Sequence, residues 1–298
     1  MGAFIMAGRW QAVLATVGLA ALSLVLPPIA LLSGAAVALV TLRLGVNQGV
    51  TVAALASLAM GGILWAMTGN PVGGLVYGMV QWLPIIGVAL VLRATTSWSL
   101  TLQAGLILGV LVVLGIHLLF HDPAAMWKTA MEKMFGAMLA EVDGGQKKQL
   151  LEESAKYMSG VFAGSLAIGV ALSMFIGRYW QAALYNPGGF GREFRELRLG
   201  HWPAFMVIAL VVVSLVFRQP LFVELLMVPL ALYFLQGVAL VHGLVYRLAM
   251  NGAWLFGLYV LLFFLLPQMI LLLAVFGVVD SFADFRSRVQ ARPRNDNS

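Results

Sequence analysis

Acidic side chains inside long apolar runs are the first candidates for chemistry, and this sequence has one. Glu224 lies in the string Pro-Leu-Phe-Val-Glu-Leu-Leu-Met that begins at Pro220. A carboxylate within a membrane is costly and typically serves a proton or a cationic ligand. A structural interpretation also holds, because an acid soon after a helix-starting proline is stabilised by the helix dipole. Glu224 would then lie at the membrane boundary, beside Arg218.

A second candidate is the pair His117 and His121, which is followed by Asp122. The spacing of four places both imidazoles on one helical face, as a metal pair requires. However, no third histidine is nearby, and His121-Asp122-Pro123 is also an ordinary helix-ending turn. The sequence therefore predicts no metal site.

The motifs of common intramembrane and hydrolytic enzymes are absent. There is no His-Glu-x-x-His, no Gly-x-Ser-x-Gly and no pair of intramembrane aspartates, and the chain has no cysteine. We therefore expect no enzymatic activity and no cofactor. A phosphate-binding loop (Gly-x-x-x-x-Gly-Lys-Ser/Thr) is also absent, so ATP-driven work would need a partner subunit.

Polar and aromatic side chains within the apolar runs are candidates for a ligand site. The strongest are Gln81, Trp82, Gln236 and, as above, Glu224. If several of them converge, they form a pocket for a small polar or aromatic molecule. Any one of them alone is more typical of a hydrogen bond between membrane helices.

The most distinctive string spans residues 186–200 and reads NPGGFGREFRELRLG. Asn-Pro-Gly-Gly is strong turn chemistry. After it, Arg192, Arg195 and Arg198 recur every three residues, opposite an apolar face of Phe190, Phe194 and Leu197. Two interpretations fit: an amphipathic helix lying on the lipid headgroups, or a helix that docks a cytoplasmic partner such as an ATPase.

The elements that position these residues are predicted to be membrane helices. Hydrophobic residues make up 61% of the chain and charged residues 10%, and residues 1–121 contain three basic and no acidic side chains. Soluble proteins carry far more charge, so the fold class is an all-α, polytopic bundle of eight or nine apolar segments with one amphipathic excursion. The segments are 10–26, 28–42, 48–67, 72–92, 100–120, 158–177, 203–217, 221–246 and 254–279.

These segments divide the chain into four parts. Membrane helices occupy 1–120, a polar helical excursion outside the bilayer 121–158, further membrane helices 159–280, and a basic disordered tail 281–298. The net charge of +6 is attributed to arginines retained on the cytoplasmic side and to anionic lipid rather than to nucleic acid. We expect a multi-pass protein of the bacterial inner membrane. Three crossings after residue 202 would leave the arginine tail outside, so either the short segment 203–217 is re-entrant or one loop is assigned to the wrong side. We keep the tail inside and expect the short segment to be re-entrant.

Two stripes indicate how helices pack. Ser165, Gly169, Ser173 and Gly177 recur every four residues, which favours close contact between helices over dimerisation. In the excursion, Trp127, Met131, Met134 and Met138 form one face. That face predicts either a partner-docking lid or a hairpin that rests on the membrane surface.

The string 186–200, with Gln236-Gly237 and the closing GVVDSFADFR from Gly277, resembles the YybS-like family of bacterial membrane proteins. That family has been grouped with the substrate-binding components of energy-coupling-factor vitamin transporters and with the rod-shape protein MreD. The resemblance implies a helical membrane fold and a ligand-binding role. This chain departs from a six-helix substrate component by its extra segments and its excursion.

Two functions follow from the sequence. The first is a transporter-like protein that binds a small molecule between its helices and depends on a partner for energy. The alternative is a non-transporting scaffold that contacts envelope-assembly or cell-shape proteins. The sequence specifies neither the ligand nor the oligomeric state.

Overall fold

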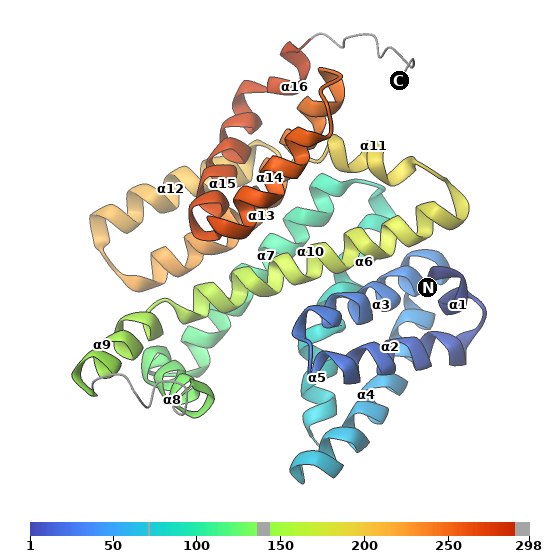
Figure 1. The fold of residues 1–298 in the computed structure, drawn as a ribbon. Helices are drawn as coiled ribbons and strands as arrows, with labels where there is room; N and C mark the ends of the chain where they lie inside the picture. Colours follow the sequence, from blue (N-terminus) through green and yellow to red (C-terminus); the bar gives the residue numbers. More distant parts are fainter. Residues whose placement is uncertain (71, 136–143, 290–298) are drawn as a thin grey trace. The chain divides into compact units, whose positions relative to one another are not determined.

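A computed structural model describes residues 1–70, 72–135 and 144–289, and within these ranges it contains helices and turns but no strand (Figure 1). This confirms the predicted all-α class. Among the described residues, seven helical segments are long and apolar enough to cross a membrane. They are Pro27–Leu44, Val46–Thr68, Gly73–Thr95, Trp98–Leu119, Met158–Tyr185, Pro220–Arg247 and Leu266–Ala283. The chain is therefore built as a polytopic membrane protein.

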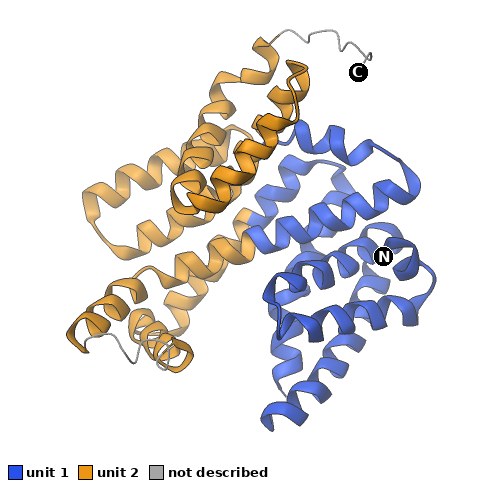
Figure 2. Cartoon of the chain, viewed as in Figure 1, with its two compact units in different colours: residues 1–105, 168–198 blue, residues 106–167, 199–298 orange. Residues whose placement is uncertain are grey.

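The chain forms two compact units (Figure 2). Unit 1 comprises Met1–Gly105 and Ile168–Arg198, and unit 2 comprises Leu106–Ala167 and Leu199–Ser298. Two long helices, α7 (Trp98–Leu119) and α10 (Met158–Tyr185), contribute residues to both units. The predicted boundaries at residues 120 and 158 do not coincide with this division.

Unit 1 begins with α1 (Gly2–Met6), α2 (Arg9–Ser23), a short 3-10 turn (Pro27–Ile29) and α3 (Ala30–Leu44). It continues with α4 (Val46–Thr68), α5 (Gly73–Gln81), α6 (Leu83–Thr95) and α11 (Gly189–Arg195). Parts of α7 and α10 also belong to this unit. Pro27 and Pro28 form the tight turn between α2 and α3, and the Ser33 hydroxyl donates to the Thr16 carbonyl across that pair. Val37, Leu39 and Met60 lie in its core.

The predicted segment 72–92 is two helices, α5 and α6, that meet at Trp82. Pro84 lies in the first turn of α6 and has no N–H, so the helical hydrogen-bond ladder cannot run through it. Upstream, Gly74 and Gly78 let α5 approach the Ser57–Gly61 stretch of α4 closely. The two glycines thus mark a close contact between α5 and α4.

Unit 2 contains α8 (Pro123–Phe135), α9 (Gly144–Ala155), α12 (His201–Phe217) and α13 (Pro220–Arg247). It ends with α14 (Ala253–Phe264), α15 (Leu266–Ala283) and α16 (Phe285–Arg288). Its closest helix contact joins α13 and α15, where Gly237 meets the Leu273 backbone and Gly277 meets the Tyr233 carbonyl.

The predicted segment 254–279 is also two helices, α14 and α15, which break at Leu265 ahead of Pro267. They run back alongside each other in Figure 1. At about 1.5 Å per residue, the 12 residues of α14 extend only about 18 Å, well short of the roughly 30 Å of a bilayer core. Arg247 Nη1 donates to the Arg286 carbonyl, so the pair leaves one end of α13 and returns to it.

The segment 203–217, which the sequence predicts to be re-entrant, forms the 17-residue helix α12. α12 packs along α13, and the two helices are joined by a turn at Arg218, whose φ of 52° is left-handed. The Tyr233 hydroxyl donates to the Gly200 carbonyl at the start of α12.

The excursion folds as a hairpin of α8 and α9. Met131 is buried against Leu151 and Ala155, with Trp127 packed beside them, so part of the predicted apolar face covers α9. Met134 is exposed, and Met138 lies outside the described residues. Lys128 Nζ lies 2.7 Å from Glu152 Oε1, and this hydrogen bond raises the pKa of Lys128 and lowers that of Glu152.

The predicted stripe on α10 lies against α3 at one end. A Cβ on Gly177 would press on Ala38 and on the Ala35 carbonyl of α3, and Ser173 is fully buried beside Gly34. Gly169 makes only an ordinary contact with Leu31, and Ser165 is exposed rather than packed. In unit 2 the close contact of α10 with α13 comes instead from Gly160 and Gly164.

Residues 281–288, assigned from the sequence to a disordered tail, are helical. Residues 281–283 complete α15, and α16 follows after Asp284. A buried ion pair holds α16 against α15, because Arg286 is 1% exposed and its Nη2 donates to Asp280 Oδ2 at 2.5 Å. Residues 290–298 lie outside the described part of the chain.

Candidate functional site

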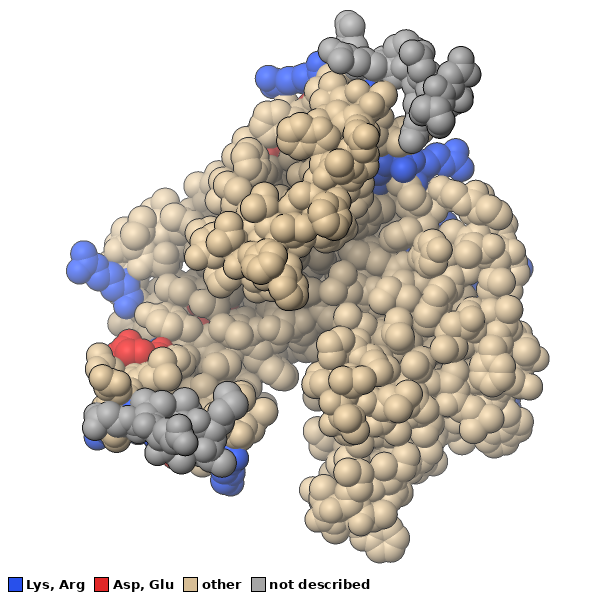
Figure 3. Space-filling model, in the orientation of Figure 1, with Lys and Arg blue, Asp and Glu red and all other residues tan. Residues whose placement is uncertain are grey.

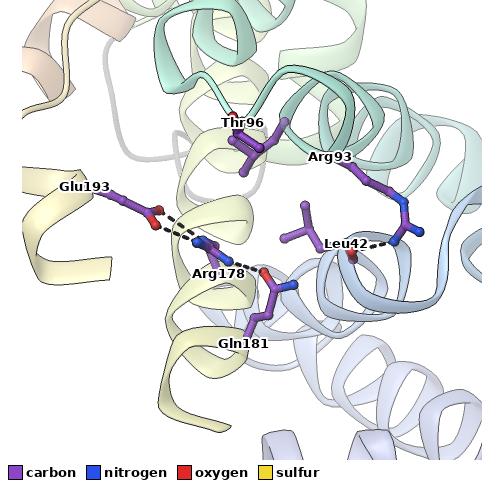
Figure 4. A pocket seen from close by; sticks show the side chains of 7 residues that line it. Leu42, Arg93, Thr96, Arg178, Gln181 and Glu193 are labelled. Atoms are coloured by element: carbon purple, nitrogen blue, oxygen red, sulfur yellow. Dashed lines mark hydrogen bonds and ion pairs between the residues drawn. The ribbon is translucent and has the colours of Figure 1, made fainter. Parts of the chain in front are cut away.

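A polar pocket of about 260 Å³ lies among the helices of unit 1 (Figure 4). α3, α6, α10 and α11, together with the residue after α6, supply its lining. The lining residues are Leu42, Leu92, Arg93, Thr96, Arg178, Gln181 and Glu193. In a chain with so few charged residues, three charged side chains around one cavity mark it as a candidate binding site.

Arg178 and Glu193 form a two-pronged ion pair on one side of this pocket. Arg178 Nη2 lies 2.5 Å from Glu193 Oε1, and Nε lies 3.0 Å from Oε2. Trp98 Nε1 donates to the same Oε2 at 2.9 Å, and Arg178 Nη1 donates to Gln181 Oε1. Burial alone would raise the pKa of Glu193, but the hydrogen bonds from Arg178 and Trp98 outweigh it and lower the pKa.

The same ion pair fixes α11. Glu193 lies on this seven-residue helix, and Phe190 and Phe194 pack against Phe175 of α10. The predicted apolar face of the 186–200 string thus rests on protein. Charge-assisted bonds of this bidentate kind hold the planar guanidinium in one orientation.

Arg93 supplies the other charge. Its Nη1 donates to the Leu42 carbonyl at 2.7 Å, in the last turn of α3, where the helix dipole favours a cation. Figure 4 shows Arg93 and Arg178 on different walls of the pocket. Two guanidinium groups and one carboxylate leave the lining with one net positive charge, so the pocket suits an anion.

The sequence-predicted ligand residues lie elsewhere. Gln81 donates to the Ala30 carbonyl at 3.0 Å, and Trp82 is fully buried with its Nε1 bonded to the Ser33 hydroxyl. Both join the α5–α6 break to the start of α3 in unit 1. Glu224 and Gln236 lie on α13 in unit 2, 12 residues and therefore about 18 Å apart. The described structure does not gather the four into one cavity.

Glu224 is buried and contacts α7 and α10. Its Oε2 lies 2.5 Å from His117 Nε2, and its Oε1 accepts the Ser159 backbone N–H at 3.0 Å. Its side-chain partner is therefore His117 and not Arg218. No cluster of three or more His, Cys, Asp or Glu residues able to hold a metal occurs among the described residues.

Gln236 is the centre of a buried polar network. Its Oε1 accepts the Leu199 N–H at 2.7 Å, and its Nε2 donates to the Gly277 carbonyl at 2.8 Å. The same Nε2 lies 3.3 Å from Asp280 Oδ2 and from the Ser281 hydroxyl. The Gln236-Gly237 and GVVDSFADFR strings, and the last residues of the 186–200 string, therefore meet in unit 2.

The three arginines of the 186–200 string do not share a helix. α11 ends at Arg195, and Arg198 lies in the non-helical segment that follows. The helix stops because Leu197 and Leu199 are buried and Gln236 captures the Leu199 N–H. Arg192 is exposed, whereas Arg195 and Arg198 are half-buried.

Sequence reasoning missed the pocket, because Arg93, Arg178 and Glu193 were not among its candidate ligand residues. The available signal was the position of the two arginines at the ends of apolar segments with Glu193 nearby. The surface agrees with a lipid environment: the face in Figure 3 is almost free of charged side chains, and Leu118 and Phe263 are 87% and 79% exposed.

Comparison with known proteins supports this environment. Residues 13–281 match the family described as "Predicted membrane protein (DUF2232)". A search of the curated proteins gives no match, and a search of the solved structures gives none either. Because the match covers most of the 298 residues, the chain belongs to the DUF2232 family of membrane proteins.

Proposed function

We propose that the chain is the solute-binding membrane subunit of a transport system and that its solute is a small anion. The observation that carries this proposal is the pocket of unit 1, whose lining has one net positive charge within an otherwise apolar protein. Its volume of about 260 Å³ is below the usual range for drug-sized ligands, so it favours a small carboxylate or phosphate over a vitamin. The YybS-like grouping with vitamin-transporter components supports the transport class but not that substrate.

The energy for transport would come from a partner. The sequence has no phosphate-binding loop, so a cytoplasmic ATPase is the natural candidate. Arg192, which is exposed on α11 next to the Glu193 of the ion pair, is the proposed contact. A partner that moves α11 would act directly on Glu193 and hence on the pocket.

The proposal predicts that Arg93→Gln lowers the amount of anion that co-purifies with the protein by about tenfold. The change removes one charge-assisted hydrogen bond, which is worth about 1.5–3 kcal/mol. The measurement is mild-detergent purification followed by mass spectrometry of bound small molecules. Arg9→Gln is the matched control, because Arg9 is exposed on α2 and outside the pocket.

The same experiment decides between the two functions. A stoichiometric anion, retained in R9Q and lost in R93Q, supports transport. Envelope-assembly proteins without any bound anion in the wild type would contradict it and favour the scaffold. In that case Arg93 would serve only as a cap of α3.

The proposal includes a membrane orientation. In unit 1, Arg93 bonds the Leu42 carbonyl and Arg43 lies over Tyr185, so the ends of α3, α6 and α10 share one basic end. In unit 2, Arg247 and Arg286 meet at the return of the α14–α15 hairpin. The positive-inside rule assigns these ends to the cytoplasm of a bacterial inner membrane and the α12–α13 turn to the outside.

Single cysteines test this orientation cleanly, because the native chain has none. We expect Gln219→Cys to react with a membrane-impermeant maleimide in intact cells, whereas Asn251→Cys and Ser287→Cys react only after permeabilisation. All three positions are exposed at or beside helix ends. If S287C is labelled in intact cells while N251C is protected, then α15 crosses the membrane and the hairpin is wrong.

A further inference from the structure

Three helices of unit 2, α7, α10 and α13, meet at Glu224. Among the acidic residues of the described membrane segments, Glu224 is the one whose side chain pairs with a histidine. Glu224 lies in the second turn of α13, and its side chain is 2% exposed. Its two oxygens face different helices: one meets His117 in the last turn of α7, and the other meets the first turn of α10. The carboxylate therefore joins three helices at one point.

The backbone of α10 reaches Glu224 because Gly160 has no side chain. A Cβ at Gly160 would overlap the Glu224 backbone, so the two helices are in direct contact there. This approach aims the Ser159 N–H at Oε1, and a helix N-terminus stabilises negative charge. The site therefore places one oxygen of Glu224 at the N-terminus of α10.

His117 decides the net charge of the junction. An imidazole is neutral or cationic near neutral pH, and a cationic ring beside the carboxylate makes a neutral pair. When the ring loses its proton from Nδ1, one buried negative charge remains, held by the Ser159 backbone N–H and by the Nε2–H of the neutral ring. Such a charge in a low-dielectric interior is far less favourable than the pair.

Water reaches the ring but not the carboxylate. The His117 side chain is 28% exposed, compared with 2% for Glu224. With Nε2 against the carboxylate, Nδ1 is the ring atom that remains to exchange a proton with water. Proton uptake at this histidine therefore converts the junction from singly negative to neutral.

No other ionisable side chain competes for Glu224 among the described residues. α10 contributes only its backbone and has no charged residue before Arg178, and α12 has none between His201 and Phe217. On the adjoining segments, Lys128 pairs with Glu152 and Lys156 with Glu153. The remaining nearby groups in the sequence are His121, Asp122, Tyr157 and Arg218, and none of them bonds Glu224.

We propose that His117 and Glu224 form a proton-binding site that controls how firmly α13 is held to α7. The site binds one proton from water at His117, and the bound state is an imidazolium–carboxylate pair. The inference is independent of the anion pocket, which lies in unit 1. It gives this membrane protein a means to respond to the proton concentration on the side where α7 ends.

The test is the pH dependence of thermal unfolding of the full chain in detergent. The ion pair needs a protonated ring, so its contribution is present at low pH and is lost as the pH rises. We expect the unfolding midpoint of the wild type to fall from pH 5.5 to 8.5 by about 5 °C more than that of His117→Gln. His121→Gln is the matched control and should retain the wild-type slope. Equal slopes in wild type and H117Q would overturn the proposal.

A second measurement does not depend on stability. In protein labelled with nitrogen-15 at histidine, the His117 ring signals, identified by their loss in H117Q, should change as the pH is moved from 5.5 to 8.5. In Glu224→Gln, which keeps an oxygen for the Ser159 N–H, this change should differ from that of the wild type. Ring signals that stay constant with pH in the wild type, or that are unchanged by E224Q, would show that the pair only holds the helices together.

Discussion

Arg286→Met is expected to lower the free energy of unfolding by about 3–5 kcal/mol. Arg286 and Asp280 are 1% and 0% exposed, and their side chains pair at 2.5 Å. Removing the arginine leaves a buried carboxylate with only the Phe285 N–H and the amide of Gln236 as partners. Equilibrium unfolding in mixed micelles, followed by tryptophan fluorescence, measures the loss.

Two further variants make this result specific. Arg288→Met removes an exposed arginine from the same short helix and should change stability little. The double variant Asp280→Asn with Arg286→Met removes both charges and should recover most of the loss, because the cost comes from an uncompensated charge. A double variant as unstable as R286M would mean that packing, and not charge, accounts for the effect.

The second large effect is expected at the contact of α13 and α15. Gly237→Ala and Gly277→Ala each place a methyl group against backbone atoms, the Leu273 carbonyl in one case and the Tyr233 carbonyl in the other. Neither obstacle is a side chain that can rotate away, so each variant should lose about 1–3 kcal/mol or more. The same unfolding measurement applies.

Gly257→Ala on α14 is the matched control. Nothing lies within 4 Å of the point that the added methyl group would occupy, so alanine should be neutral or should stabilise the helix by up to about 1 kcal/mol. A loss of stability in Gly237→Ala together with a gain in Gly257→Ala would show that the loss arises at the contact of α13 and α15. A loss at Gly257 equal to that at Gly237 would refute this account.

The sequence predicts the fold class well because charge and hydropathy act locally. Runs of apolar residues identify the membrane segments, and the glycine and serine spacings at Gly74, Gly78 and Gly177 identify real contacts. Proline positions were harder to interpret. Pro84 and Pro267 end one helix and begin the next, whereas Pro229 lies inside α13 without ending it. Composition does not distinguish these outcomes, since neighbouring helices determine which occurs.

The sites could be predicted only in part, because their partners are distant in the chain. Glu224 is conspicuous in the sequence, but its partner His117 is 107 residues away. Gln236 is equally conspicuous, and its acceptor Gly277 is 41 residues away. The pocket was missed for the same reason: Arg93 and Arg178 look like topology markers until the fold places them around one cavity.

The network around Gln236 also constrains the order in which the chain is made. Leu199 is synthesised well before Gln236, but Gly277 and Asp280 follow 41 and 44 residues later. Until these residues and Ser281 emerge from the ribosome, three of the four hydrogen bonds of the Gln236 amide are unmade. We therefore expect the hydrogen bonds that hold α13 in place to be completed only after α15 has been synthesised and has packed against it.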